Sequence, residues 1–150
     1  MADVTPSSRD EYPYFEGITT RWADNDIYGH VNNVAYYGFF DTAVNHFLVR
    51  SGVLDPERSH VIGLVVETGC RYMKPIAFPD RVAVGVRVDR IGTSSVRYAI
   101  GIFRGEEDDP AAEGHFVHVY VDRDKRRPVP VPDAMRTALE ALMLHRQGKD

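Results

Sequence analysis

The sequence contains a single cysteine, Cys70, and no run of about twenty apolar residues. One cysteine cannot form an intramolecular disulfide, so we expect a reducing compartment. The missing apolar run argues against a membrane-spanning helix. The first residues, MADVTPSSRDEYPYF, also lack the basic start and apolar core of a signal peptide. These absences together predict a cytoplasmic protein with no membrane partner.

The sequence has no excess of positive charge, because 22 acidic side chains stand against 18 basic ones. Non-specific nucleic-acid binding needs a net basic surface, so no nucleic-acid partner is expected. The G-x-S-x-G element of many serine hydrolases is absent as well. Hydrophobic residues make up 43% and charged residues 27% of the 150 residues, and this composition is typical of one globular domain. We expect a loose arm over residues 1–12 and a single domain over 13–150.

Apolar residues at every second position predict a mostly antiparallel sheet. The expected strands lie at residues 14–22, 61–73, 81–91, 96–106 and 114–124. Short turns between the last strands favour a meander over parallel crossovers. A long helix is expected over 32–52, with asparagine caps at its start and Gly52 at its end. A second helix is expected over 132–146. The predicted fold class is α+β, with the long helix covering one face of the sheet.

One face of the long helix is predicted to be apolar. At about 100° per residue, it carries Val34, Tyr37, Phe40, Val44, Phe47 and Leu48. Asp41 falls at the edge of this face, between the angles of Val34 and Leu48. A buried carboxylate is costly unless it is satisfied, so its presence needs a reason. Contact with a bound substrate and a hydrogen bond to a neighbouring tyrosine hydroxyl are both open.

A polar stretch, WADNDIYGHVNN, lies between the first strand and the long helix. Its aspartates begin like a calcium loop, but Tyr28 and Ala35 stand where ligand oxygens are needed. No zinc spacing fits either, so no metal is expected. Two interpretations remain open. In one, Asn32 or Asn33 only caps the helix. In the other, free N–H groups at the helix start stabilise an oxyanion beside a catalytic carboxylate.

The segment RWADNDIYGHVNNVAYYGFFDTA resembles the hotdog-fold acyl-CoA thioesterases of the 4-hydroxybenzoyl-CoA thioesterase-like superfamily. In that family an Asp-x-Asp-x-x-Gly element leads into a central helix. The variant HVNN is similar to an element of plant acyl-carrier-protein thioesterases. Downstream, RYMKPIAFPDRVAVGVRV resembles the family's Tyr-x-x-Pro, aspartate and long-strand pattern. The resemblance covers residues 14–125 and is not specific for one substrate.

The resemblance implies a hotdog fold, in which a five-stranded antiparallel sheet wraps around a long central helix. It also implies a homodimer or a homotetramer, with sheets paired edge to edge and active sites at the dimer interface. The second aspartate of the element, here Asp26, would be the catalytic carboxylate. The backbone N–H that polarises the thioester carbonyl would belong to Asn33. The polar His30, Asn32 and Asn33 stand where the benzoyl-CoA branch has apolar and aromatic residues.

Several further residues are candidates for the site. His30 either orients Asp26, lines the substrate entrance or acts as a base, or else it only bonds to local backbone. Glu67 interrupts an apolar strand and is either a second catalytic carboxylate or a residue of the outer sheet face. Cys70 is expected to pack as a small hydrophobic residue. Substrate contacts are expected at Gly29, Asn32, Tyr36 and Asp41.

Coenzyme A carries phosphates, so a net acidic protein needs a local basic site to bind it. Lys74 supplies one cation near the end of the second strand. The segment DRDKRRP supplies Arg123, Lys125 and Arg126. These side chains are candidates for the nucleotide end of the substrate. The alternative is a solvated charge run at a strand end.

The function expected from these features is hydrolysis of an acyl-CoA thioester, with coenzyme A present only as part of the substrate and no other cofactor. Asp26 would act as nucleophile or general base. A hotdog hydratase or dehydratase acting on acyl thioesters is one alternative. A non-enzymatic acyl-CoA-binding module is another, in which Asp26 would be catalytically idle.

Overall fold

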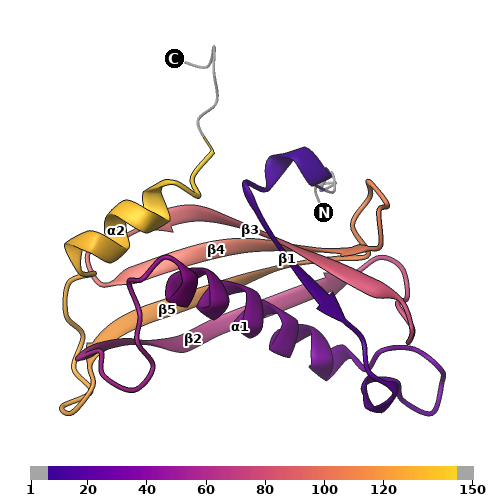
Figure 1. The fold of residues 1–150 in the computed structure, drawn as a ribbon, viewed down its shortest axis with the longest axis horizontal. Coiled ribbons are helices and arrows are strands. Elements are labelled where there is room, and N and C mark those ends of the chain that lie inside the picture. The colour runs from indigo at the N-terminus through magenta and orange to yellow at the C-terminus, as the bar shows by residue number, and fades with distance from the viewer. Residues whose placement is uncertain (1–6, 145–150) are drawn as a thin grey trace, which may run out of the picture.

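The computed structural model describes residues 7–144, which form five strands and two α-helices (Figure 1). The elements are β1 (Tyr14–Thr19), α1 (Asn33–Arg50), β2 (Val61–Tyr72), β3 (Arg81–Ile91), β4 (Ser95–Arg104), β5 (Ala112–Asp122) and α2 (Asp133–Glu140). Short 3-10 turns precede β1 at Arg9–Glu11 and follow it at Trp22–Asp24. Within the described residues, neither helix is long and apolar enough to cross a membrane.

The strands form one antiparallel sheet in the order β1-β3-β4-β5-β2. The long helix α1 lies along one face of this sheet, and α2 packs beside β3 at one end (Figure 1). The expected fold class is therefore confirmed, including the C-terminal helix. Because β3, β4 and β5 are neighbours both along the chain and in the sheet, and are joined by the short segments 92–94 and 105–111, the meander expected from the short connections is also present.

The inner face of the sheet, which α1 covers, is built from registered apolar rows. One row runs from Val86 through Ile100 and Gly114 to Cys70, across four strands. Phe40 of α1 packs directly over Gly114, where an added Cβ would lie 2.5 Å from the Phe40 ring. The glycine therefore creates the space that lets the helix approach β5 closely.

Two expected element limits and the expected buried face of α1 are corrected. β1 ends at Thr19, because Trp22 already begins a 3-10 turn. The side chain of Val34 is 70% exposed, and Tyr36, Phe39 and Ala43 are buried instead. The buried stripe is therefore rotated away from the predicted one at the start of α1. Helix α2 ends at Glu140, and residues 145–146 of the expected helix lie outside the described residues.

The segment from Ser8 to Tyr12 is not a loose arm, as expected for residues 1–12, but packs on the outer face of the sheet. The Tyr12 ring is buried and lies over Gly85 and Gly101, where added Cβ atoms would come within 2.8 Å of it. The Arg87 guanidinium carbon stands 5.1 Å from the centre of the same ring. Residues 1–6 of the expected arm lie outside the described residues.

The strand β2 forms one edge of the sheet and contains a β-bulge. Val65 pairs with His118 and Glu67 with Val117, so Val66 is an extra residue in the ladder. The middle of the strand is exposed, and the Val66 side chain is 60% accessible. Among the described strands, none pairs with the outer edge of β2. Such an edge, with exposed valines, is a surface on which another strand can pair.

The packing at Gly114 generates a stability prediction. Gly114→Ala is expected to destabilise the protein by ~2–3 kcal/mol, because its Cβ would collide with Phe40 and with the Gly69 carbonyl oxygen. Gly17→Ala is the matched control, because no described residue other than its chain neighbours lies within 4 Å of the position that its methyl group would take. Its free energy of unfolding should rise by ~0.5 kcal/mol. Urea unfolding measures both changes. Equal stabilities for the two variants would contradict the packing described here.

Candidate functional site

The first turn of α1 is capped by asparagine and leaves one backbone donor available. The Asn32 side-chain Oδ1 accepts from the Val34 N–H at 2.9 Å, and the Asn32 carbonyl accepts from the Ala35 N–H at 2.9 Å. No hydrogen bond between described residues uses the Asn33 N–H. Asn32 is therefore the cap, one of the two interpretations left open by the sequence, and Asn33 begins the helix. The Asn33 amide adds to the positive end of the helix dipole.

The loop before the helix holds Asp26 in a tight turn. The Asp26 N–H donates to the His30 carbonyl at 2.9 Å, and its carbonyl accepts from the Gly29 N–H at 3.1 Å. One carboxylate oxygen, Oδ1, accepts from the Tyr28 N–H at 2.9 Å. Gly29 has a φ of 84°, a conformation that favours glycine and closes the turn. The turn thus orients the half-buried Asp26 carboxylate through one oxygen only.

Asp24, the first aspartate of the element, fixes this loop to the rest of the chain. Its buried carboxylate accepts hydrogen bonds from the Arg21 N–H at 2.8 Å and from the Arg21 guanidinium at 2.8 Å. Burial alone would raise the pKa of Asp24, but the hydrogen bonds and charge of Arg21 outweigh it and lower that pKa. The Asp24 carbonyl also accepts from the Asn32 N–H at 2.8 Å. Asp24 therefore positions the cap of α1.

A hollow of about 310 Å³ lies at the start of α1, between the helix and the end of β2. The residues that line it are His30, Val31, Asn33, Tyr36, Tyr72, Met73, Lys74 and Pro75. The Tyr72 hydroxyl donates to the Asn33 carbonyl at 3.2 Å, which ties β2 to the first turn of the helix. The rings of Tyr36 and Tyr72 meet edge to face at 4.9 Å.

Two tyrosines that line the hollow, and a cysteine near them, are held neutral by burial. Burial raises the pKa of Tyr36 to about 12 and raises that of Tyr72 further, so both hydroxyls stay protonated at neutral pH. Burial also raises the pKa of the Cys70 thiol to about 11. A protonated thiol is a poor nucleophile, and Cys70 packs against the core as expected.

The structure brings together some of the residues predicted for the site. Asn33, His30, Tyr36 and Lys74 all line the hollow. Asp26 is not among the lining residues, but its turn adjoins the hollow through the backbone bond to His30. That bond uses the His30 carbonyl, and within residues 7–144 no hydrogen bond joins the His30 ring to Asp26. His30 thus orients Asp26 through its backbone.

Asp41 and Glu67 lie outside the hollow. Asp41 is exposed rather than buried, and its carbonyl and Oδ1 both accept from the Asn45 side chain at 2.9 Å. The premise of a buried carboxylate was wrong, because the nearby helix face at Val34 is itself exposed. Glu67 lies on the outer sheet face, where it bonds to His115 Nε2 at 2.7 Å. It therefore points away from α1, as the outer-face alternative predicted.

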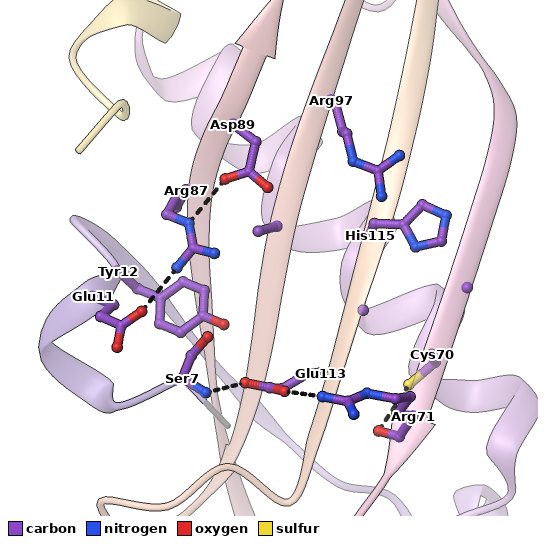
Figure 2. Close-up of a pocket in the computed structure, with 13 residues that line it drawn as sticks. Ser7, Glu11, Tyr12, Cys70, Arg71, Arg87, Asp89, Arg97, Glu113 and His115 are labelled. Atoms are coloured by element: carbon purple, nitrogen blue, oxygen red, sulfur yellow. Dashed lines mark hydrogen bonds and ion pairs between the residues drawn. The ribbon is translucent and has the colours of Figure 1, made fainter. Parts of the chain in front are cut away.

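A larger groove, of about 600 Å³, lies on the outer face of the sheet, on the side opposite α1 (Figure 2). Its charged side chains bond to one another. Arg71 pairs with Glu113 at 2.7 Å, and Arg87 pairs with Asp89 at 3.0 Å. Glu113 also accepts a hydrogen bond from the Ser7 N–H. Because these groups satisfy each other, the smaller hollow at the start of α1 is the better candidate site.

Arg123, Lys125 and Arg126 do not lie near the hollow of their own chain. They follow β5 at the left end of the sheet in Figure 1, whereas α1 begins at the right. Ala112, at the start of β5, pairs with Tyr72 beside the hollow. The 11 residues of β5 then extend roughly 35 Å, at about 3.3 Å per residue, to the far end. One chain cannot bring these cations to its own hollow.

Tyr72 belongs to the site although no role was predicted for it. It is the tyrosine of the Tyr-x-x-Pro pattern, so a signal for it was present. Its function became visible only in the fold, because its partner Asn33 lies 39 positions away along the chain. Lys74, in contrast, was predicted as a basic residue and does line the hollow, where it pairs with Glu107 at 2.6 Å.

The family model and the solved structures that resemble this chain agree with one another. Residues 20–139 match the model of a thioesterase-like superfamily. A Pseudomonas aeruginosa protein of known structure is 50% identical, over 95% of this chain and 100% of that chain, with a TM-score of 0.92. A Thermus thermophilus thioesterase solved with coenzyme A and zinc is 31% identical, over 89% of this chain and 96% of that chain, with a TM-score of 0.74.

The likeness in fold extends to more distant proteins. A 1,4-dihydroxy-2-naphthoyl-CoA thioesterase from Synechocystis has a TM-score of 0.77 at 17% identity, over 84% of this chain and 94% of that chain. At this level of identity the likeness concerns the fold alone.

The Asp24–Arg21 pair generates a pH prediction. Asp24→Asn is expected to lower the free energy of unfolding at neutral pH by ~1–3 kcal/mol, because it removes a buried charged acceptor. The pKa of Asp24 is lowered by folding, so its contribution is present above the ordinary value of 3.8 and is lost as the pH falls below it. Urea unfolding of both proteins between neutral and acid pH should show their stabilities converging. A difference that stays constant down to about pH 2 would contradict this role.

Proposed function

Because the chain belongs to the thioesterase-like superfamily, we propose that it hydrolyses an acyl-CoA thioester at the start of α1. The single observation that supports this most is the Asn33 N–H at the helix N-terminus. No described residue accepts from it, and Asn33 lines a hollow that adjoins the Asp26 turn. Thioester hydrolysis is the activity that family membership supports. The acyl-CoA substrate and the roles of the individual residues are our proposal.

The Asn33 amide is the proposed oxyanion donor. As water or a carboxylate adds to the thioester carbonyl carbon, negative charge develops on the carbonyl oxygen. A fixed N–H at a helix N-terminus stabilises the negative oxygen of the transition state more than it stabilises the neutral carbonyl oxygen of the bound substrate. The activation barrier is therefore lowered. The Tyr72 hydroxyl holds the Asn33 carbonyl, so it fixes the peptide unit at the helix start without contacting the substrate.

Asp26 is the proposed nucleophile or general base. Its Oδ1 is held by the Tyr28 N–H, and among the described residues no donor binds Oδ2. A carboxylate anchored through one oxygen presents the other in a defined direction. The C–S bond then breaks and the thiol leaves as thiolate, since a thiol with a pKa of about 8.5 needs no strong general acid.

Coenzyme A is the proposed carrier because the Thermus thermophilus relative was solved with it. Lys74 lines the hollow and is the cation of this chain best placed to contact the polar part of the carrier. Of the other predicted substrate contacts, Tyr36 lines the hollow, whereas Gly29 and Asn32 are not lining residues and only adjoin His30 and Asn33 along the chain. Of these, Tyr36 is buried against Tyr72 and would limit the depth available to the acyl group.

A homodimer is the proposed assembly. The β2 edge exposes Val65 and Val66, and an edge strand with apolar side chains can extend its sheet by pairing with a second copy. A two-fold axis makes such a contact closed and self-complementary. Since Tyr72 ends β2, the hollow would then lie at the interface.

Substitution of Asp26 tests the proposed chemistry. Asp26→Asn is expected to lower kcat/KM by ~100-fold or more, since the amide cannot accept the proton or attack the carbonyl. The measurement is release of free thiol from short, long and aromatic acyl-CoAs. Asp89→Asn, on the outer face, is the matched control and should retain wild-type rates.

Three outcomes would contradict parts of this proposal. Thiol release that survives in Asp26→Asn would remove Asp26 from the mechanism and leave the family assignment intact. Binding of acyl-CoA without any turnover would favour a binding module. Consumption of an unsaturated acyl-CoA without thiol release would favour a hydratase.

Heavy-oxygen labelling separates the two roles of Asp26. In a single turnover in labelled water with enzyme in excess, a nucleophilic Asp26 first forms a mixed anhydride with the acyl group. Water that attacks the Asp26 carbonyl carbon of this anhydride gives unlabelled product and leaves the label in the Asp26 carboxylate. A general base instead delivers labelled water to the product acid and leaves Asp26 unlabelled. Label found by mass analysis in the peptide that contains Asp26 therefore identifies the nucleophilic route.

A further inference from the structure

Tyr36 carries a polar group that the proposed chemistry does not use. The residue lines the hollow at the start of α1, and only 3% of its surface is exposed. No hydrogen bond between residues in the range 7–144 involves its hydroxyl. In the same range, no buried polar side-chain atom that is closed off from solvent lacks a partner. The Tyr36 hydroxyl is therefore reached from outside the chain, through the hollow that the residue lines.

The packing of its ring fixes the direction of this hydroxyl. The Tyr36 and Tyr72 rings meet edge to face with centres 4.9 Å apart, and the Phe39 ring lies at 5.8 Å on the same helix. All three contacts involve rings that cannot turn without losing buried surface. Burial also raises the pKa of Tyr36 to about 12, so the hydroxyl remains protonated at neutral pH. It is a preoriented, neutral hydrogen-bonding group.

The other polar side chains of the hollow are either occupied or exposed. The Tyr72 hydroxyl donates to the Asn33 carbonyl at 3.2 Å. Lys74 is held in an ion pair at 2.6 Å. The side chains of His30 and Asn33 are exposed to water. Of the polar side chains that line the hollow, Tyr36 is therefore the buried one, and no residue of the described chain occupies its hydroxyl.

Tyr36 lies close to the proposed oxyanion donor. It follows Asn33 by three positions, so the two residues share one face of α1, with a rise of about 4.5 Å along the axis. The hollow measures about 310 Å³, near the lower limit of ~300 Å³ for ligand pockets. The large, charged carrier needs the open side, where Lys74 lies. A short acyl group is therefore left for the buried side, at Tyr36.

We propose that the Tyr36 hydroxyl binds a hydroxyl group on the acyl chain, so that short hydroxyacyl thioesters are the preferred substrates. This inference rests on the proposed thioesterase function. An unsubstituted chain would displace water from the Tyr36 hydroxyl and would return no hydrogen bond. A hydroxylated chain replaces the lost bond. A site that hydrogen-bonds a substrate hydroxyl rejects the analogue that lacks it.

Removal of this single hydroxyl tests the inference. Tyr36→Phe keeps the ring and its packing. The substrates are butyryl-CoA and its derivatives with a hydroxyl on C2 or C3, each enantiomer assayed separately by thiol release. The wild-type kcat/KM for at least one hydroxybutyryl-CoA should exceed that for butyryl-CoA by ~10-fold or more. In Tyr36→Phe, the value for that substrate should fall by ~10-fold or more, whereas the value for butyryl-CoA should stay unchanged or rise.

Tyr12→Phe is the matched control. It also removes a hydroxyl from a buried ring, but on the outer face of the sheet, away from the hollow. Both kcat/KM values should therefore equal those of the wild type. A general loss of structure in Tyr36→Phe would lower the two rates together, so opposite responses to the two substrates identify a contact with the acyl hydroxyl.

Two kinetic results would overturn the inference. One is a wild-type protein that hydrolyses butyryl-CoA as fast as every hydroxybutyryl-CoA. The other is an equal loss on all substrates in Tyr36→Phe, which would place the hydroxyl against an atom that all acyl-CoAs share, in the thioester carbonyl or in the carrier.

A binding measurement keeps this inference separate from the proposed function. Calorimetric titration of Asp26→Asn should give a Kd at least ~10-fold lower for the preferred hydroxybutyryl-CoA than for butyryl-CoA. The double variant Asp26→Asn, Tyr36→Phe should bind both equally. A wild type inactive on every thioester would refute the proposed function, whereas the same Kd for both ligands in Asp26→Asn would refute the recognition by Tyr36.

Discussion

The position of α1 on the sheet depends on the absence of a side chain at Gly114. Phe40 fills the space that a Cβ would occupy there, so the middle of the helix lies close against β5. A close-packed interior does not allow the helix to slide or tilt freely. The first turn of α1 therefore lies in a fixed position beside the end of β2, where the Tyr72 hydroxyl donates a hydrogen bond to the Asn33 carbonyl. The geometry of the candidate site begins with this contact.

Much of the fold could be predicted because the signals are local. The alternation of Val82, Val84, Val86 and Val88 identifies a strand whose inner face is fully buried, and the structure confirms it. The face of α1 was less predictable. Periodicity treats all turns of a helix alike, whereas solvent reaches Val34 at the open end of the sheet. Tyr36 is buried there instead, because it meets Tyr72 of β2, a contact between distant parts of the chain.

The candidate site also combines features that local sequence predicts with features that it does not. The cap at Asn32 was predictable because capping depends on residues within the same turn. The exposure of Asp41 was not, since it follows from which helix face the sheet covers. The packing of Tyr12 could not be predicted either, because Gly85 and Gly101, which pair across β3 and β4 and create the space for the ring, lie far from Tyr12 along the chain. Residue chemistry therefore indicated the candidate site, whereas the residues that line it follow from contacts between distant parts of the chain.

The bulge in β2 shifts the alternation of side chains between the two faces of the sheet by one residue. Before it, residues with odd numbers, such as Val65, point toward α1, and after it residues with even numbers, such as Tyr72, do so. A deletion of one residue between the bulge and the end of the strand would therefore exchange the two faces beyond the deleted position. Arg71 would turn toward the helix and Tyr72 toward the outer groove. In homologues of this chain, insertions and deletions in this part of β2 should consequently be tolerated only in pairs.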